Sequence, residues 1–408
     1  MSDVRSVSVS LAQSGNARAS FLTSWIERLL RRIAFGSISL VLPNGERLTR
    51  AGANPGPDAK LVIHRWRTVW RLITGGELAF AQAYIDGDWL TPDLLAVLAF
   101  GARNEAALSA PIAGSAVMRV LNRVRHWRRR NTRRGSRRNI AAHYDLGNAF
   151  YALWLDRGMN YSSALFSAED QTLEAAQDAK LDRAAALLDA SHGEHVLEIG
   201  CGWGSLAERM AANCKVTGVT LSTEQLAHAR QRLSRSGLTA DLRLQDYRDI
   251  AGRYDRIVSI EMIEAVGERY WPVYFAKLHD LLADGGTVVL QAITMEERRF
   301  AYYRGQPDFI QRYIFPGGML PTIDIIRREA AKAGLAMVAQ ETFGQSYALT
   351  LEHWRARFMA AWPAIEPLGF DAAFKRMWEY YLCYCEVGFH DGAIDVGFFK
   401  FVRNDAAA

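Results

Sequence analysis

A glycine-rich stretch near the middle of the chain carries the strongest chemical signal. Glu198 is followed by glycines at positions 200, 202 and 204, between an apolar run and a helical pattern that continues to Ala211. The stretch predicts a buried strand, a tight loop and a helix. Such a loop directs backbone N–H groups and a helix N-terminus at a ligand, and glycine lets the ligand approach the backbone closely. We therefore expect a ligand-binding loop here.

The spacing of these glycines narrows the class of ligand. A dinucleotide-binding loop needs G-x-G-x-x-G to hold a pyrophosphate, a spacing that this stretch does not have. The segment from Glu198 to Gly204 instead resembles the E/D-x-G-x-G-x-G loop of class I S-adenosylmethionine (SAM) methyltransferases. A nicotinamide or flavin site and a purely structural turn remain as alternatives to a SAM site.

Strand and helix patterns alternate from this loop onward. Apolar runs predict strands at 195–199, 216–221, 241–244, 256–260 and 287–290, and a helix is predicted over 224–234. This alternation is typical of an α/β fold with a doubly wound, Rossmann-like sheet. Ligands of such sheets lie at the carboxyl ends of the strands, near the point where the strand order reverses. The residues at this edge are Gly200, Thr220, Gln245, Asp246 and Ile260.

Length and composition indicate two domains and no membrane span. The 408 residues exceed the roughly 250–300 at which a single core stops growing. The four cysteines form no C-x-x-C pair and no secretory segment is recognised, which favours a reducing compartment without structural zinc or disulfides. No apolar run approaches the roughly 18–20 residues of a membrane span, so we expect any membrane contact to be peripheral.

The positive charge of the chain is concentrated in one segment. Ten arginines and no acids lie between Arg119 and Arg138, so the net charge of +5 becomes 5 − 10 = −5 without this segment. The segment lacks the spaced aromatics of a single-strand binder and any zinc-finger or helix-turn-helix pattern, which argues against nucleic acid. Docking on an anionic lipid surface is the favoured interpretation, and a solvated linker is the alternative.

The N-terminal part predicts a small α+β domain. Residues 1–20 are rich in Ser and Ala and are expected to be disordered. An amphipathic helix is predicted over 21–33, either lying in a membrane interface or, slightly favoured, packing on its own domain. Strands are expected at 38–42 and 61–64, and helices within 66–89 and over 94–100. The predicted domains are 21–117 for lipid positioning, an arginine-rich linker at 118–139 and a methyltransferase at 140–408.

Two segments before the glycine loop extend the resemblance to a particular family. Residues 142–151 (AHYDLGNAFY) and 159–166 (MNYSSALF) are similar to segments of the cyclopropane-fatty-acyl-phospholipid synthase family, which includes the mycolic acid cyclopropane synthases. Further matching segments are 245–249, 312–321 and 343–347. The resemblance covers roughly residues 140–400 and implies a class I SAM-methyltransferase domain behind a smaller N-terminal α+β domain.

The family resemblance implies a reaction on lipid. The SAM methyl is attacked by a cis double bond of a phospholipid acyl chain, and a bound bicarbonate then removes a proton. A cyclopropane is the leading expected product, and a methyl-branched or methyl-olefinic chain is the alternative. From a different class, a non-catalytic lipid-binding protein is disfavoured by the intact glycines, Gln225, Asp246 and Glu264. The expected setting is the cytoplasmic face of a membrane, without nucleic acid, and a homodimer is left open.

The resemblance also assigns site residues. Tyr161 and Ser162 fall near the methionine end of SAM. The backbone at Gly200 and Gly202 lies against SAM. The ribose lies near Thr220, Leu221 and Gln225, and the adenine near Gln245 and Asp246. Ile260 lies at the same edge of the sheet. For Asp246 a helix N-cap is the alternative role.

The bicarbonate positions are Ser163, Glu264, Gln291, Ile293 and Tyr347. Ser163 and Gln291 replace a Cys and a His of the family, and neither supplies a titrating proton near neutral pH. Cys385 aligns with a C-terminal Cys proposed for the family site, with a buried structural thiol as the alternative. Attack of the alkene on the SAM methyl leaves a carbocation, which an aromatic face can stabilise. The candidates for this role are Tyr144, Tyr313, Phe315 and Tyr347, and the alternative is that they are ordinary core residues.

Overall fold

The computed structural model describes residues 20–112 and 146–404, and for 109–112 it describes the backbone alone. The expected disordered segment before residue 20 and the whole arginine segment 119–138 lie outside the described residues, as does Tyr144. The described residues form two compact units. One unit contains residues up to 112 together with Asp371–Val387, and the other contains 146 to Phe370 together with the residues from Gly388 onward. The segment 371–387 thus groups with the N-terminal residues, although the sequence analysis placed it in the methyltransferase domain.

The first unit combines a small sheet with helices, as expected for an α+β domain. Its sheet has the order β2-β1-β3-β4, and β1 and β3 are parallel. The strands are β1 (Phe35–Val41), β2 (Arg47–Ala51), β3 (Asn54–Ile63) and β4 (Trp89–Leu90). The helices are α2 (Arg67–Ile85), α3 (Leu94–Arg103), α4 (Glu105–Ile112) and α16 (Ala372–His390) up to residue 387.

A helix over residues 20–30 precedes this sheet, where the sequence predicted an amphipathic helix. Its apolar face is buried at Leu22, Ile26 and Leu30, and Ile33 just beyond the helix is buried too. Burial of this face supports packing on the protein over insertion into a membrane interface. In the described part of the chain no helix is both long and apolar enough to span a membrane.

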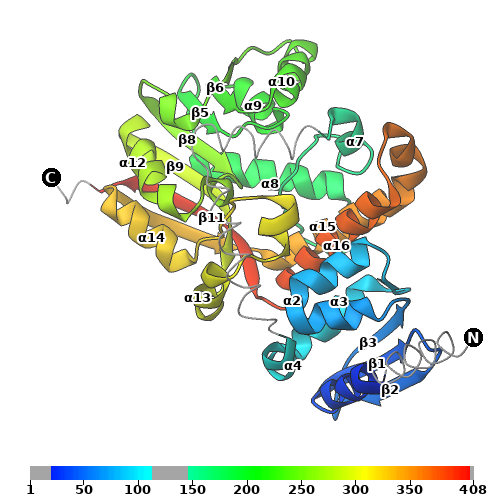
Figure 1. Cartoon of the computed structure of the whole chain (residues 1–408). Helices are drawn as coiled ribbons and strands as arrows, with labels where there is room; N and C mark the ends of the chain where they lie inside the picture. Colours follow the sequence, from blue (N-terminus) through cyan, green and yellow to red (C-terminus); the bar gives the residue numbers. More distant parts are fainter. Residues whose placement is uncertain (1–19, 113–145, 405–408) are drawn as a thin grey trace, which may run out of the picture. The chain divides into compact units, whose positions relative to one another are not determined.

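The second unit is built on a seven-stranded sheet (Figure 1). The strand order is β10-β11-β9-β8-β5-β6-β7. The strands are β5 (His195–Ile199), β6 (Lys215–Thr220), β7 (Asp241–Leu244), β8 (Tyr254–Ile260), β9 (Leu282–Met295), β10 (Leu335–Thr342) and β11 (Ile394–Arg403). Pairs among β5 to β9 are parallel, whereas β11 runs antiparallel to both of its neighbours. The five strands predicted from the sequence are confirmed, and the antiparallel edge is an addition to them.

Helices cover both faces of this sheet, which confirms the doubly wound arrangement. On one face lie α8 (Leu173–Leu188), α9 (Ser205–Ala211) and α10 (Thr223–Arg235), and their apolar residues share a core with β5, β6 and β8. On the other face lie α12 (Trp271–Leu281) and α14 (Ile323–Lys332). The shorter segments are α7 (Asn148–Ala152), α11 (Ile263–Val266), α13 (Glu297–Gly305) and a π-helical turn at Ile310–Ile314, and α15 (Gly344–Ile365) is a long helix.

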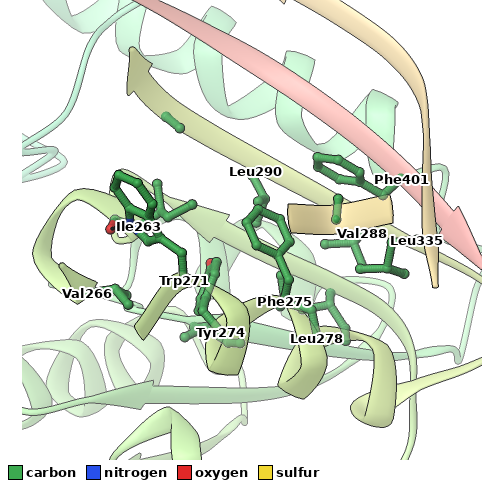
Figure 2. Packing of buried hydrophobic residues seen from close by; sticks show 14 of the residues in the cluster. Ile263, Val266, Trp271, Tyr274, Phe275, Leu278, Val288, Leu290, Leu335 and Phe401 are labelled. Atoms are coloured by element: carbon green, nitrogen blue, oxygen red, sulfur yellow. Dashed lines mark hydrogen bonds between the residues drawn. The ribbon is translucent and has the colours of Figure 1, made fainter. Parts of the chain in front are cut away.

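The second core shows how α12 fixes the sheet. Phe275 points from α12 toward Leu290 of β9, whereas the Trp271 ring lies beside Ile263 and donates to its carbonyl oxygen over 3.3 Å (Figure 2). All four of these side chains are nearly inaccessible to solvent. Because burial of large apolar side chains stabilises by roughly 1.5–3 kcal/mol each, this contact holds the neighbouring carboxyl ends of β8 and β9 in a fixed place.

The order of the sheet reverses between β5 and β8. The chain leaves β5 toward β6 and returns to pair β8 on the other side of β5. The glycine loop follows β5, and Glu261 follows β8. The Ser259 hydroxyl donates to the carbonyl oxygen of Ile199 over 2.8 Å, which ties the two strand ends together. The two loops therefore meet at the edge where the sequence predicted a ligand site.

Candidate active site

The glycine loop has the backbone geometry that its sequence requires. Gly200, Gly202 and Gly204 all have positive φ angles, of 86°, 50° and 87°. A Cβ on Gly204 would lie 2.8 Å from the Cβ of Ala229 on α10, so this glycine permits close helix packing. A Cβ on Gly202 would meet no atom of the described residues within 4 Å. The loop thus has open space beside its second glycine, as a site for a small molecule needs.

The ends of β6 and β7 are joined by polar contacts of three predicted SAM-binding residues. The Thr220 hydroxyl donates to Gln225 Oε1 over 2.9 Å, and the Gln245 N–H donates to the carbonyl oxygen of Thr220 over 3.1 Å. Asp246 begins a 3₁₀ turn and accepts from the Arg248 N–H over 3.0 Å, so its carboxylate has the N-cap role that the sequence analysis gave as the alternative. An ion pair to Arg248 of 2.6 Å holds the same carboxylate.

A buried lysine, absent from the sequence predictions, lies beside these strand ends. The Lys180 ammonium on α8 donates to the Ser162 hydroxyl over 2.7 Å. Burial lowers the pKa of Lys180 to about 8, against the opposing effect of the carboxylates of Glu261, Asp156 and Glu198. A single ammonium therefore faces three carboxyl groups inside the protein.

Glu198 completes this charged group. Burial raises its pKa to about 7, and its Oε2 is buried without a hydrogen-bond partner among the residues that the structure describes. An unpaired buried acceptor fits a ligand that brings a donor or a positive charge. SAM carries an ammonium and a sulfonium, so Glu198 and the open space at Gly202 fit SAM. When bound, SAM supplies an electrophilic methyl group.

Aromatic side chains surround the predicted methionine end of this site. The ring of Tyr161 lies 5.4 Å from that of Tyr151, 5.7 Å from Trp154 and 5.3 Å from Trp354. Tyr151, Trp154 and Trp354 are buried. Rings at these separations form a continuous aromatic wall whose faces attract positive charge.

Three of the predicted bicarbonate positions meet around a residue that sequence analysis missed. Glu261 Oε1 accepts from the Ser163 N–H over 2.8 Å and from Gln291 Nε2 over 2.7 Å. Its Oε2 accepts from the Tyr347 hydroxyl over 2.7 Å. The Ser163 hydroxyl does not take part, because it donates to the carbonyl oxygen of Ala164 over 2.8 Å. A carboxylate of the chain itself thus binds the groups expected to hold an external anion.

The other two bicarbonate positions contact one another. The Ile293 N–H donates to Glu264 Oε1 over 2.5 Å, while Glu264 Oε2 is buried and has no hydrogen-bond partner within 20–112 and 146–404. Burial raises the pKa of Glu264 to about 8, and the charge of Glu261 raises it further. The Met319 N–H donates to the carbonyl oxygen of Glu264 over 2.9 Å, which brings the segment after Phe315 to this side of the site.

The remaining predicted residues are distributed as follows. Leu221 and Ile260 are partly buried at the ends of β6 and β8. Tyr313 stacks near Phe309 with ring centroids 5.1 Å apart. Cys385 is a partly buried thiol on α16 within the first unit, and its assignment to the site stays a prediction. Across residues 20–112 and 146–404 no group of His, Cys, Asp and Glu is arranged to hold a metal ion.

A sequence signal for Glu261 was present but ambiguous. Two acids, Glu261 and Glu264, follow the same strand, and the resemblance pointed to the second. The simultaneous replacement of a Cys and a His by neutral Ser163 and Gln291 was the other clue. Neutral hydrogen-bond donors such as Ser163 and Gln291 suit a site whose negative charge comes from a carboxylate of the protein.

Comparisons with known proteins agree with this geometry. The family model for mycolic acid cyclopropane synthetase matches residues 131–399. Tuberculostearic acid methyltransferase UfaA1 of Mycobacterium tuberculosis is 41% identical over 92% of this chain and 90% of that protein. Cyclopropane-fatty-acyl-phospholipid synthase of Escherichia coli K12 is 35% identical over 84% of this chain and 88% of that protein.

Solved structures give the same result. Mycolic acid cyclopropane synthase CmaA1, complexed with SAH and CTAB, is 33% identical with a TM-score of 0.61, covering 65% of this chain and 97% of that one. Coclaurine N-methyltransferase, at 18% identity and a TM-score of 0.62, shares the fold. The match over two thirds of the chain, the glycine loop and the doubly wound sheet lead to one conclusion: this chain belongs to the mycolic acid cyclopropane synthetase family of SAM-dependent methyltransferases.

Proposed function

We propose that the enzyme transfers the methyl group of SAM to a carbon of a cis double bond in an unsaturated phospholipid acyl chain. The observation that carries the proposal is the meeting of the glycine loop with an aromatic wall and a held carboxylate at one sheet edge. Relatives named for fatty-acyl phospholipid and tuberculostearic acid support the lipid substrate. An alkene has no proton to lose before it reacts, so the site must stabilise positive charge and then accept a proton.

The reaction balances as follows. The π electrons of the double bond form a C–C bond to the methyl group while the C–S bond breaks and its electrons remain on sulfur. The other alkene carbon is left as a carbocation. The rings around Tyr161 stabilise this cation by roughly 0.5–2 kcal/mol per contact and offer no lone pair that would trap it. Loss of a proton then returns a C–H electron pair to the cation.

The proposed product is a methylated acyl chain that keeps a double bond. Ring closure is the leading expectation from the family resemblance, and it depends on a bound bicarbonate. Here Glu261 occupies the donors expected to hold that ion. Three hydrogen bonds fix the Glu261 carboxylate, so it does not move with the methyl group as this group passes from the sulfur of SAM to the acyl chain. Proton loss from a neighbouring chain carbon gives the alkene. The relative that matches 92% of the chain is named a methyltransferase, which supports this choice.

A cyclopropane is the second candidate. The relatives named cyclopropane synthases favour it, as does the Glu264–Ile293 contact at two of the positions that the resemblance assigns to the anion. In that case the proton is lost from the added methyl group, and its C–H electrons close the ring. A difference of about 1.4 kcal/mol between the two barriers changes the product ratio tenfold.

The test is the structure of the acyl product. The full-length enzyme is incubated with SAM and vesicles of cis-monounsaturated phospholipid, and the released methyl esters are separated by gas chromatography with mass detection. A ring and a methyl-alkene have equal mass, so each sample is also mildly hydrogenated, which saturates the alkene alone. We expect the new peak to gain two hydrogens. A new peak that hydrogenation leaves unchanged would show that the product is a cyclopropane. The absence of any methylated ester would overturn the proposed function.

We further propose that the arginine segment 119–138, outside the described residues, docks the enzyme on the anionic inner face of the membrane. Each basic residue near such a surface contributes on the order of 1 kcal/mol, reduced by salt. Docking brings the acyl chains of the bilayer within reach of a protein that extracts or bends them into its site.

A further inference from the structure

The backbone of Glu261 has a conformation that its side chain does not favour. Its φ angle is 47°, in the left-handed region, and its N–H donates to the carbonyl oxygen of Gln291 over 2.8 Å. This conformation is strained for a non-glycine residue, because its Cβ approaches the following carbonyl oxygen. Such strain persists where the surrounding structure holds the residue, and it gathers at functional positions. Here it turns the Glu261 side chain toward the groups at Ser163 and Tyr347.

The partners of the Glu261 carboxylate define its protonation. The Ser163 N–H and the Gln291 Nε2 group can only donate, so Oε1 remains an acceptor. Both residues are buried, at 0% and 1% exposure, so no water replaces these donors. Lys180 adds a positive charge to the surroundings. The donors hold the Glu261 carboxyl group at a fixed place beside the end of β8 and favour its ionised form.

We propose that the Glu261 carboxylate is the proton acceptor of the reaction, so that the enzyme works without bicarbonate. The proposal rests on the proposed function, namely methylation of an alkene. After the C–C bond has formed, a Glu261 oxygen takes a proton from a carbon next to the cation, and the C–H electrons form the new bond of the product. The protonated Glu261 then releases its proton to solvent before the next turnover.

The chemistry and the charges of the site support this role. Protons next to a carbocation are strongly acidic, so a carboxylate is a sufficient base. Burial raises the pKa of Glu261 above its ordinary value, against the lowering effect of its three donors and Lys180. A carboxylate with a raised pKa is a stronger base than an exposed one. A second anion in this place would lie beside Glu261 and near Glu264, and like charges in a buried site repel strongly. An external bicarbonate is therefore both excluded and unnecessary.

The first test measures turnover without dissolved carbonate. Full-length enzyme, SAM and unsaturated phospholipid vesicles are assayed in buffer purged of CO₂, with and without added sodium bicarbonate. Wild-type turnover should agree within about twofold in the two buffers. Glu261→Gln keeps the size of the side chain and should lower turnover about 100-fold or more, as loss of a general base does, while SAM affinity changes by less than about threefold.

The second test restores the base from solution. Glu261→Gly suits the left-handed backbone and leaves a hole with the Ser163, Gln291 and Tyr347 donors intact. Sodium bicarbonate or sodium formate should raise the turnover of this variant at least tenfold and saturably. The matched control is Asp189→Gly, which replaces another residue of positive φ, 51°, at the end of α8. Asp189→Gly should keep wild-type turnover and show no response to either anion.

A binding measurement separates this inference from the proposed function. ¹³C-bicarbonate is titrated with wild type and with Glu261→Gly and followed by NMR. We expect binding to the glycine variant and none to wild type. Bicarbonate binding by wild type, or none by the glycine variant, would overturn the assignment even if no methyl transfer were seen. Wild-type turnover that requires bicarbonate, or an active Glu261→Gln enzyme, would overturn it as well. A different outcome is that bicarbonate binds only to Glu261→Gly, as expected, but wild type transfers no methyl group. That outcome would overturn the proposed function.

Discussion

The backbone N–H of Ile293 donates to Oε1 of Glu264 over 2.5 Å, and the other carboxyl oxygen of Glu264 is buried without a partner in the described part of the chain. The sequence analysis had assigned both residues to one anion, and the structure shows them in direct contact. A carboxyl group with one buried free oxygen and a pKa near 8 holds a proton at neutral pH. Glu264 is thus the neutral acid of the site, whereas Glu261 accepts three hydrogen bonds and lies near the charge of Lys180.

The raised pKa of Glu264 predicts a pH dependence of stability. Its pKa in the folded protein is about 8 against an ordinary 4.5, so between these values the folded form keeps a proton that the unfolded form has lost. Stability must then fall as pH rises through this window, by up to about 1.4 kcal/mol per pH unit from this group. Glu264→Gln should reduce the fall in Tm between pH 5.5 and 7.5, measured by calorimetry. The control Glu169→Gln, at an exposed position, should leave the fall unchanged.

Replacing Lys180 should destabilise the second unit. Lys180→Met removes the ammonium that faces Glu198, Asp156 and Glu261, and an unpaired buried charge costs roughly 3–5 kcal/mol. We expect a clear loss of Tm, measured by tryptophan fluorescence, with Lys215→Met at an exposed strand end as the control. Equal Tm values for the two variants would show that Lys180 does not compensate these carboxylates.

Adding a side chain at Gly202 should remove SAM binding. The Cβ of Gly202→Val would enter the open space of the loop, and its φ of 50° disfavours a branched residue. The matched control is Gly237→Val, an exposed glycine with φ of 65° and equally open surroundings. Isothermal titration should detect SAM binding by the control and none by Gly202→Val. Wild-type affinity in a folded Gly202→Val protein would contradict the cofactor site.

Neutralising the arginine segment should weaken membrane binding. The variant changes Arg128, Arg129, Arg130, Arg133 and Arg134 to Gln, removing five positive charges. Sedimentation with anionic vesicles should show a loss of binding that added salt reproduces in wild type. Neutral vesicles serve as the reference. Unchanged sedimentation with anionic vesicles would leave the segment as a linker without a docking role.

The sequence by itself determined the parallel half of the sheet and the cofactor loop. Strands such as 195–199 and 241–244 are short apolar runs, and the glycines after Glu198 impose a backbone that other residues avoid, so both signals are local. The helix before β1 was also predicted correctly, because the spacing of its apolar residues is a local signal too. The antiparallel strands β10 and β11 lie far apart in the chain and were missed, because their pairing depends on contacts more than fifty residues apart.

Only the tertiary structure decided which acid holds the anion position. Glu261 and Glu264 are three residues apart on one loop, and their spacing does not say which carboxylate turns toward Tyr347. The choice depends on the left-handed backbone at residue 261 and on donors supplied by the loop before α8, strand β9 and helix α15. These segments meet only when the sheet and its helices have packed, since hydrogen bonds between distant segments have no signature in local sequence.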